Sequence, residues 1–113
     1  MHLKNFSLLY KDTGPVVLSP AYDLLSTRLL IPEKFDPEEM ALTLNGKKRK
    51  LNRNDFDLFG KNIGLTTKQI QNALSLMQKK LDLFYKLIRM SLLPDEMKND
   101  FIKLIESRWQ RCL

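Results

Sequence analysis

Residues 66–90, TTKQIQNALSLMQKKLDLFYKLIRM, decide the fold of this 113-residue chain. The stretch opens with Thr66 and has Gln69 three residues later, a capping-box pattern that begins helices. Apolar residues then recur at steps of three, four and seven, which places them on one helix face. They are Ile70, Ala73, Leu74, Met77, Leu81, Phe84 and Ile88. The pattern predicts a long amphipathic helix over 67–90 whose apolar face belongs to the core.

The segments on either side of this helix are also predicted to be helical. Upstream, Asn52 followed by Asp55 is typical of a helix cap with an acid in the first turn, and Gly64 marks the end of that helix. Downstream, Pro94 is expected at the first position of a last helix, where a missing N–H costs nothing. The apolar face of this last helix comprises Met97, Phe101, Leu104, Ile105 and Trp109. Residues 52–113 are therefore predicted to be helical.

The first third of the chain has the composition of extended structure. The runs NFSLLY (5–10) and VVLS (16–19) are rich in strand formers, and KDTGP between them supplies turn residues. They predict an antiparallel hairpin, which Pro20 ends because proline has no N–H for the ladder. Residues 21–28 are expected to form a loop or one helical turn.

A second hairpin is predicted over 40–51, where Asn45-Gly46 is a strong two-residue turn signal. Residues 29–39, with two prolines, are expected to be an irregular connection. The fold class is therefore α+β, mostly helical, with one or two small antiparallel hairpins at the N-terminal side.

Composition excludes several classes of protein. The longest stretches without a charged residue are ten residues, whereas a membrane helix needs about 20 apolar ones, so no membrane partner is expected. No apolar run follows Met1, and the lone Cys112 cannot form an internal disulfide, so a reducing, cytoplasmic location is expected. One cysteine and one histidine also argue against a dedicated zinc site and against a Ser/His/Asp or Cys/His hydrolase.

The net charge of +6 is concentrated in one short segment. KKRKLNR (47–53) holds five cations and no anion, and the rest of the chain has a net charge of only +1. Such a patch attracts nucleic acid or an acidic partner. The candidate contact residues are Lys47, Lys48, Arg49, Lys50 and Arg53. A solvated hairpin arm is the alternative, since lysines on an edge strand discourage aggregation.

Two polar residues flank the first predicted hairpin. Asn5 stands at the entrance of its first strand and Asp23 just past its second, so both lie at the same end. A carboxylate and an amide oxygen that converge there can hold Mg²⁺, which accepts few protein oxygens and otherwise uses water and phosphate. Protein kinases bind their metal through an Asn of the catalytic loop and a later Asp. The alternative is that Asp23 is an ordinary loop acid that caps a short helix.

The stretches HLKNFSLLY (2–10) and LSPAYDLLST (18–27) resemble the HipA-like serine/threonine kinases, the toxins of bacterial toxin–antitoxin pairs. The signature loop of that family reads Asp-x-His-x-Lys-Asn-Phe-Ser and is followed by a hairpin and a Pro-x-Tyr-Asp segment. MALTLNGKKRKL (40–51) and the helical tail also fit the C-terminal lobe of the family. The resemblance implies that residues 1–113 form a single partial domain from the distal part of a kinase-like C-terminal lobe. Residues 1–31 would hold the catalytic-loop remnant, the metal-site hairpin and the following loop.

The resemblance also implies a reaction, the transfer of a phosphoryl group from Mg-ATP to a protein hydroxyl. The catalytic base of such kinases is an Asp five residues before the metal-binding Asn, which would fall just before Met1. No catalytic base is therefore assigned, and the chain is expected to be inactive alone. The implied cofactor-binding residues are His2 and Lys4 near the nucleotide phosphates, Asn5 and Asp23 on Mg²⁺, and Tyr22 beside the metal-binding Asp.

Two functions stay open at this stage. The first is a C-terminal piece or subunit of a HipA-like kinase, whose exposed apolar surface would be covered by the N-terminal kinase lobe or by a second copy. The second is a non-catalytic interaction module of a toxin–antitoxin complex, in which residues 47–53 contact DNA alongside a DNA-binding antitoxin. A truncated gene product, an expressed subdomain and a split subunit are all compatible with the sequence.

Overall fold

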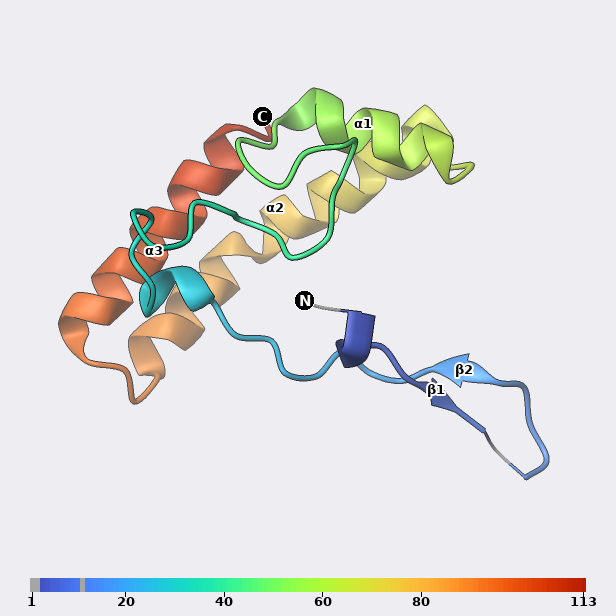
Figure 1. Ribbon diagram of the computed structural model, residues 1–113, viewed down its shortest axis with the longest axis horizontal. Helices are drawn as coiled ribbons and strands as arrows, with labels where there is room; N and C mark the ends of the chain where they lie inside the picture. Colours follow the sequence, from blue (N-terminus) through green and yellow to red (C-terminus); the bar gives the residue numbers. More distant parts are fainter. Residues whose placement is uncertain (1–2, 11) are drawn as a thin grey trace.

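A computed structural model describes residues 3–10 and 12–113. Within these residues, three helices form the body of the molecule: α1 (Arg53–Asn62), α2 (Thr67–Met90) and α3 (Asp95–Gln110). α3 runs back alongside α2, and α1 packs at the other end of α2, close to the C-terminus (Figure 1). A small two-stranded ribbon extends away from this body on the N-terminal side. The predicted α+β fold class is confirmed.

The helices begin where their capping residues predict. At α1, Asn52 and Asp55 form a reciprocal capping box, and at α2, Thr66 and Gln69 do the same, so each cap satisfies backbone N–H groups of the first turn. The predicted bounds of the long helix are confirmed at both ends. Pro94 was expected inside α3 but is its N-cap residue, with an extended ψ of 147°. α3 therefore begins one residue later than predicted.

The first hairpin is present but shorter than predicted. Its strands are β1 (Leu8–Leu9) and β2 (Val17–Leu18), paired antiparallel, and the Ser19 N–H adds one further bond to the Ser7 carbonyl at 2.8 Å. Residues 3–5, of which Asn5 was predicted to begin the strand, instead form a 3-10 turn, η1. The strands are short because each has only one neighbour, and a lone two-stranded ribbon has little to stabilise it.

The predicted second hairpin is reduced to its turn. Leu44 and Lys47 exchange two backbone hydrogen bonds around Asn45-Gly46, whose φ angles of 51° and 72° suit the mirror-image turns of hairpins. The flanking residues form no strands in the described structure, so the prediction of a hairpin over 40–51 is wrong beyond the turn. The backbone of Lys50 is left-handed, with φ 52°, and this ends the extended alternation that a strand needs.

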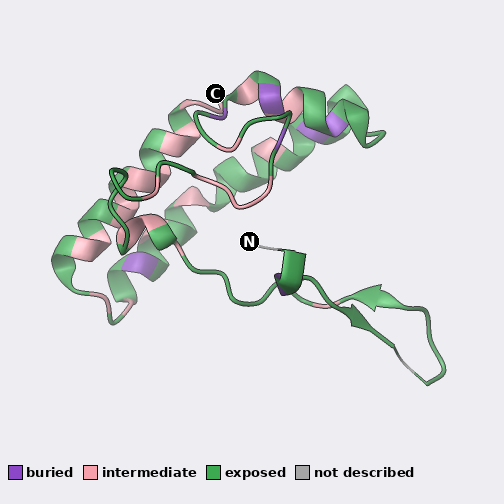
Figure 2. Cartoon of the chain, in the orientation of Figure 1, coloured by how far each residue is buried: buried purple, intermediate pink, exposed green. Residues whose placement is uncertain are grey.

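The core is small for so much apolar sequence. Its buried apolar side chains among the described residues are Leu44, Leu51, Ile70 and Ile88. Figure 2 shows that buried positions are sparse along the helices and that both strands of the ribbon are exposed. On α2 the two ends of the predicted apolar face are buried, but its middle is not: Met77 is 48% exposed and Phe84 is 36% exposed. The prediction that the whole face lies in the core is therefore wrong for this part.

A 3-10 turn, η2 (Thr27–Leu29), packs against α3 and carries the chain from the ribbon to the helical body. The predicted irregular connection over 29–39 follows it. No helix among the residues that the structure describes is long and apolar enough to cross a membrane.

Candidate metal centre

The structure brings Asn5 and Asp23 into direct contact. The Asn5 amide donates from Nδ2 to Asp23 Oδ2 over 2.7 Å, although the two residues are 18 positions apart. Asn5 ends η1 before β1, and Asp23 follows β2, so the hairpin returns the chain to its own starting point. The two predicted metal ligands thus lie at one end of the ribbon, as the sequence analysis expects. That they bind a metal stays a prediction.

The two side chains have different surroundings. Asn5 is buried, with 6% of its surface exposed, whereas Asp23 is exposed. The backbone of Asp23 is left-handed, with φ 53°, a conformation uncommon outside glycine and tolerated by Asp and Asn. Strained backbone of this kind concentrates at binding and catalytic sites. Asp23 does not cap the helical turn that follows it, since the N-cap residue of η2 is Ser26. Its carboxylate accepts from Asn5.

Tyr22 also holds these two segments together. Its hydroxyl oxygen lies 2.7 Å from Ser7 Oγ, and the hydroxyl donates to the Lys4 carbonyl at 3.2 Å. Residues 4–7 and 22–23 are therefore joined by three side-chain hydrogen bonds as well as by the ladder. The role of Ser7 was missed from the sequence, because a serine on a strand carries no spacing signal.

The donor chemistry of this pair fits a magnesium ion. Mg²⁺ binds oxygen at about 2.0–2.1 Å, so two ligands of one ion lie about 3 Å apart. The Asn5 and Asp23 head groups are in direct contact and between them carry one amide and two carboxylate oxygens. The 2.7 Å contact itself joins the Asn5 amide nitrogen, which is not a metal ligand, to Asp23 Oδ2, so metal binding would replace this hydrogen bond and turn the amide oxygen toward the ion. Within the described part of the chain there is no cluster of three or more His, Cys, Asp or Glu side chains that could hold a metal. Few protein ligands are usual where phosphates and water complete the shell of Mg²⁺.

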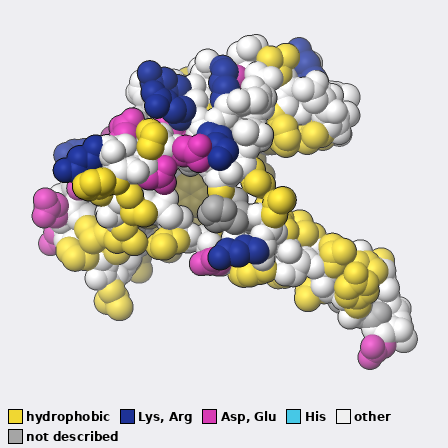
Figure 3. All heavy atoms as spheres, viewed as in Figure 1, with side chains coloured by type: hydrophobic (Ala, Val, Ile, Leu, Met, Phe, Trp, Pro, Cys, Tyr) yellow, Lys and Arg dark blue, Asp and Glu magenta, His cyan; other side chains and the backbone are white. Residues whose placement is uncertain are grey.

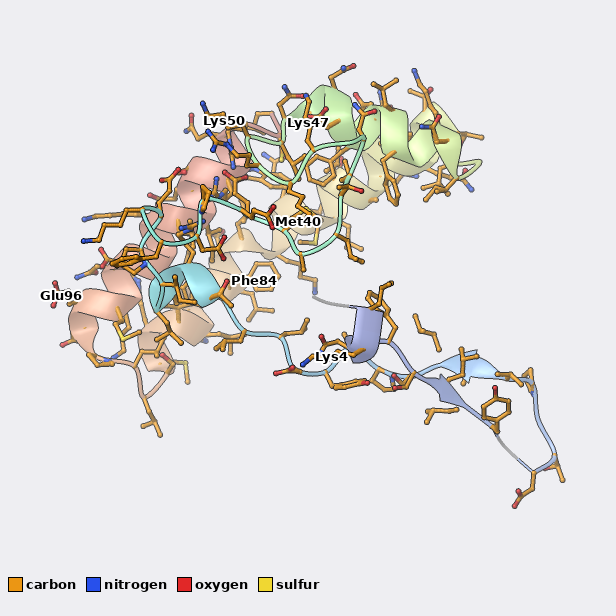
Figure 4. All side chains as sticks on the ribbon, viewed as in Figure 1. Lys4, Met40, Lys47, Lys50, Phe84 and Glu96 are labelled. Carbon is orange, nitrogen blue, oxygen red and sulfur yellow. The ribbon has the colours of Figure 1, made fainter. Side chains whose placement is uncertain are left out.

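Two further residues, Lys4 and His2, were predicted to lie near the nucleotide phosphates. Lys4 extends from η1 beside the segment that leads from β2 to η2, on the ribbon side of the molecule (Figure 4). Its backbone carbonyl is the acceptor for Tyr22, and its side chain is exposed. The prediction for His2 lies outside the described residues.

The basic segment lies elsewhere, at the α1 end of the body (Figure 4). Three of its five cations form ion pairs within the chain: Lys47 with Asp55 at 2.8 Å, Lys48 with Glu38 at 3.0 Å, and Arg53 with Asp57 at 3.1 Å. Arg49 and Lys50 form no ion pair among the described residues. Nucleic-acid contact through this segment stays a prediction. The segment has less unpaired positive charge to support such contact than the sequence suggests.

Asp55 is the fully buried centre of this region. It accepts hydrogen bonds from the Lys47 and Asn45 side chains and from the Asn52 backbone N–H. These bonds, that from Lys47 first, lower its pKa from 3.8 to about 2 despite burial. The sequence identified Asp55 only as a first-turn acid, so its link to the Asn45-Gly46 turn was missed.

A second ion-pair cluster joins the loop to α3. Glu39 pairs with both Arg108 and Arg111, about 70 positions along the chain. Burial alone raises the pKa of Glu39, but the hydrogen bond from Arg111 and the charges of both arginines outweigh it and leave the pKa below its usual value. The pairs fix the loop that closes one side of a cavity of about 840 Å³ between that loop and the helices. Asn5 and Asp23 lie on the wall of this cavity.

The fold is α+β, with Asn5 and Asp23 in contact at the base of the two-stranded ribbon. The family model of the HipA-like C-terminal domain matches residues 1–83, which is most of the chain. The chain belongs to this HipA-like family.

One curated relative is a protein named putative kinase Y4dM, from Sinorhizobium fredii (strain NBRC 101917 / NGR234). It is 70% identical to this chain over 27 residues. These residues make up 24% of the chain and 7% of the relative, so the likeness is strong but local. The matched part spans far less than two thirds of the relative's length.

Proposed function

We propose that this chain supplies the metal-binding part of a HipA-like serine/threonine protein kinase, which transfers a phosphoryl group from Mg-ATP to a protein hydroxyl. The observation that carries the proposal is the 2.7 Å contact between Asn5 and Asp23 at the base of the ribbon. The family match and the kinase name of a local relative support the same conclusion.

Each residue of the site has a defined task in this proposal. Asn5 and Asp23 would hold Mg²⁺, which, when bound, bridges the nucleotide phosphates and neutralises their charge. The Asn5 side chain is fixed by burial, whereas Asp23 is exposed and can face the nucleotide. Lys4 supplies a cation next to this pair, and His2 belongs to the same loop. Tyr22 acts as a positioning residue, because its hydroxyl ties the loop of Lys4 to the segment of Asp23.

The 113-residue polypeptide should not catalyse this reaction by itself. The catalytic base of protein kinases is an Asp five residues before the metal-binding Asn, and none of the residues assigned to this site takes that role. Phosphoryl transfer depends on positioning and on charge stabilisation, of which a metal pair supplies only a part. Transfer of labelled phosphate from ATP to any protein by this polypeptide, even in a single turnover, would overturn this part of the proposal if the Asp23→Asn variant failed to do it.

Metal binding tests the proposal directly. Mn²⁺ replaces Mg²⁺ as a spectroscopic probe, and its binding to the purified chain is followed by electron paramagnetic resonance with and without ATP. Asp23→Asn should weaken Mn²⁺ binding by about tenfold or more, because it removes the only carboxylate of the pair. Asparagine tolerates the left-handed backbone, so a loss of binding reports the charge and not a strained chain.

Asp12→Asn is the matched control, since Asp12 is an exposed acid in the β1–β2 loop of the same ribbon. It should leave Mn²⁺ binding unchanged. Equal binding by the wild type and by Asp23→Asn would show that the Asn5–Asp23 pair is not the metal site.

A further inference from the structure

α2 carries a second line of apolar residues besides its predicted core face. Leu76, Leu83 and Met90 recur every seven residues, and Leu87 lies between the last two. These four side chains, here called the outer seam, keep between 46% and 70% of their surfaces exposed, and none of them lines the cavity of about 840 Å³. Leu76, Leu83 and Leu87 each come one position before a residue of the core face, so the seam is turned by about 100° from that face.

The outer seam has the spacing and the width of a contact between two helices. A repeat of seven is the one with which helices pack along a narrow line. Leu76 and Met90 lie 14 positions apart, which corresponds to about 21 Å, or four turns. The seam ends beside the turn between α2 and α3, where Figure 3 shows hydrophobic side chains at the surface. A helix that lies on a membrane needs a broader apolar face, and the broad face of α2 lines the cavity instead.

Lysines border the outer seam on both sides. Lys79, Lys80 and Lys86 each lie three or four positions from two residues of the seam, so they are its neighbours on the helix surface. All three are exposed, and none forms an ion pair among the residues that the structure describes. α2 as a whole has five cations and one acid, a net charge of +4. Its cations are thus available to a partner, unlike most of those in the basic segment (47–53).

The charges around the outer seam indicate the chemistry of this partner. In a two-fold dimer both chains use the same patch, so a second copy would bring lysines against lysines. A nucleic acid would satisfy the lysines, but its phosphates would leave the leucines between them uncovered. An amphipathic helix with its own apolar seam, bordered by glutamates, satisfies both the leucines and the lysines.

We propose that the outer seam of α2 is a docking surface for an acidic amphipathic helix of a partner protein. The apolar seam of that helix packs on Leu76, Leu83, Leu87 and Met90, and its glutamates pair with the bordering lysines. The inference goes beyond the proposed function and does not depend on it, because its test requires neither metal nor nucleotide.

The probe is a synthetic peptide of about five helical turns, with leucines at the spacing of the outer seam and glutamates beside them. A fluorescent label at one end reports its binding to the purified chain through anisotropy. Added salt should weaken this binding, because the paired charges lie at the surface. A second peptide, with the same leucines but lysines in place of the glutamates, should not bind.

Two substitutions on α2 locate the bound peptide. Leu83→Asp places a charge in the outer seam, and Met77→Asp places one on the face that lines the cavity, at nearly equal exposures of 46% and 48%. Leu83→Asp should weaken binding of the glutamate peptide by about tenfold, and Met77→Asp should leave it unchanged. Far-ultraviolet circular dichroism checks that both variants keep their helices.

Charge reversal tests the choice of an acidic partner without disturbing apolar packing. The double variant Lys79→Glu/Lys86→Glu should bind the glutamate peptide about tenfold more weakly and should gain binding of the lysine peptide. Lys68→Glu is the matched control, because Lys68 is an exposed lysine of the same helix, eight positions before Leu76. It should change the binding of neither peptide.

Several results would overturn the proposal. They are failure of the glutamate peptide to bind, equal binding of both peptides, equal weakening by Leu83→Asp and Met77→Asp, and an unchanged peptide preference after charge reversal. Self-association of the chain that Leu83→Asp abolishes would assign the outer seam to a second copy instead. Binding to phosphatidylserine vesicles that the same substitution abolishes would assign it to a lipid surface. Mn²⁺ binding at Asn5 and Asp23 can succeed or fail independently of all these results.

Discussion

Tyr22 and Ser7 face each other across the hairpin, with 2.7 Å between their hydroxyl oxygens. The single proton of the Tyr22 hydroxyl goes to the Lys4 carbonyl, so Ser7 is the donor to the Tyr22 oxygen. This chain of two hydrogen bonds connects the turn that ends at Asn5 with the residue next to Asp23. The geometry of the Asn5–Asp23 pair therefore depends on a tyrosine that does not itself belong to the pair.

Tyr22→Phe should weaken Mn²⁺ binding while leaving the fold intact. Phenylalanine keeps the ring but removes both hydrogen bonds, each worth about 0.5–1.5 kcal/mol. A loss of metal affinity equal to one of these bonds corresponds to a fall of about twofold to tenfold, which is the effect we expect. The measurement is the Mn²⁺ titration of the variant. Tyr10→Phe is the control, because Tyr10 is 77% exposed on the same ribbon.

A double-mutant cycle separates this role from a general loss of stability. Ser7→Ala and Tyr22→Phe remove two ends of one interaction, so their effects on Mn²⁺ affinity should be less than additive. Strictly additive effects would mean that the two hydroxyls do not act together on the Asn5–Asp23 pair.

Gly60→Ala should destabilise the chain although alanine is the better helix former. A Cβ atom at this position would lie 2.6 Å from both Cγ1 and Cδ1 of Ile70, so α1 and α2 could not keep their present approach. Overpacking of this kind costs about 1–3 kcal/mol, which exceeds the gain of about 1 kcal/mol in helix propensity. Urea unfolding measures the difference. A more stable variant would show that α1 and α2 are not in such close contact.

The features that the sequence predicted correctly are those determined by nearby residues. The capping boxes at Asn52 and Thr66 and the turn at Asn45-Gly46 each involve fewer than five residues, and all three are present. Strand length depends on a partner and on what covers the ribbon, so both hairpins were overestimated. The open middle of the α2 face has the same cause, because periodicity predicts which residues seek burial but not whether the chain contains their partner.

In the candidate site, too, contacts between nearby segments could be predicted and contacts between distant ones could not. The contact between Asn5 and Asp23 was predictable, because any hairpin returns its second strand to the start of its first. The ion pairs of Glu39 with Arg108 and Arg111 cross the whole domain, and no spacing in a single sequence indicates them. The cavity was missed for a similar reason, since its walls come from six segments spread along the whole chain.

The buried carboxylate of Asp55 predicts a loss of stability in acid. Folding lowers its pKa from 3.8 to about 2, because the charged form is held by Lys47 and Asn45. Its contribution to the stability of the folded chain is therefore fully present above about pH 4 and disappears as the pH falls towards 2. Glu39, whose pKa is also lowered, acts in the same direction.

Thermal unfolding between pH 2 and 6 measures this contribution when the wild type is compared with Asp55→Asn. The variant should be less stable at pH 6, and the difference between the two proteins should shrink as the pH falls towards 2. A constant difference over this range would mean that Asp55 does not titrate with folding.

The basic segment (47–53) contains two kinds of cation. Some stabilise the fold through ion pairs, and others are available to contact a nucleic acid. Lys47 neutralises the buried Asp55, whereas Arg49 is exposed and forms no ion pair among the described residues. Lys47→Ala should lower the melting temperature by roughly 5 °C, and Arg49→Ala should leave it unchanged. Because so much of the segment is paired within the chain, we expect no salt-dependent DNA binding. If DNA does bind, replacing Arg49 and Lys50 with alanine should reduce the slope of log affinity against log salt by about two, and such a result would favour the interaction module over the kinase lobe.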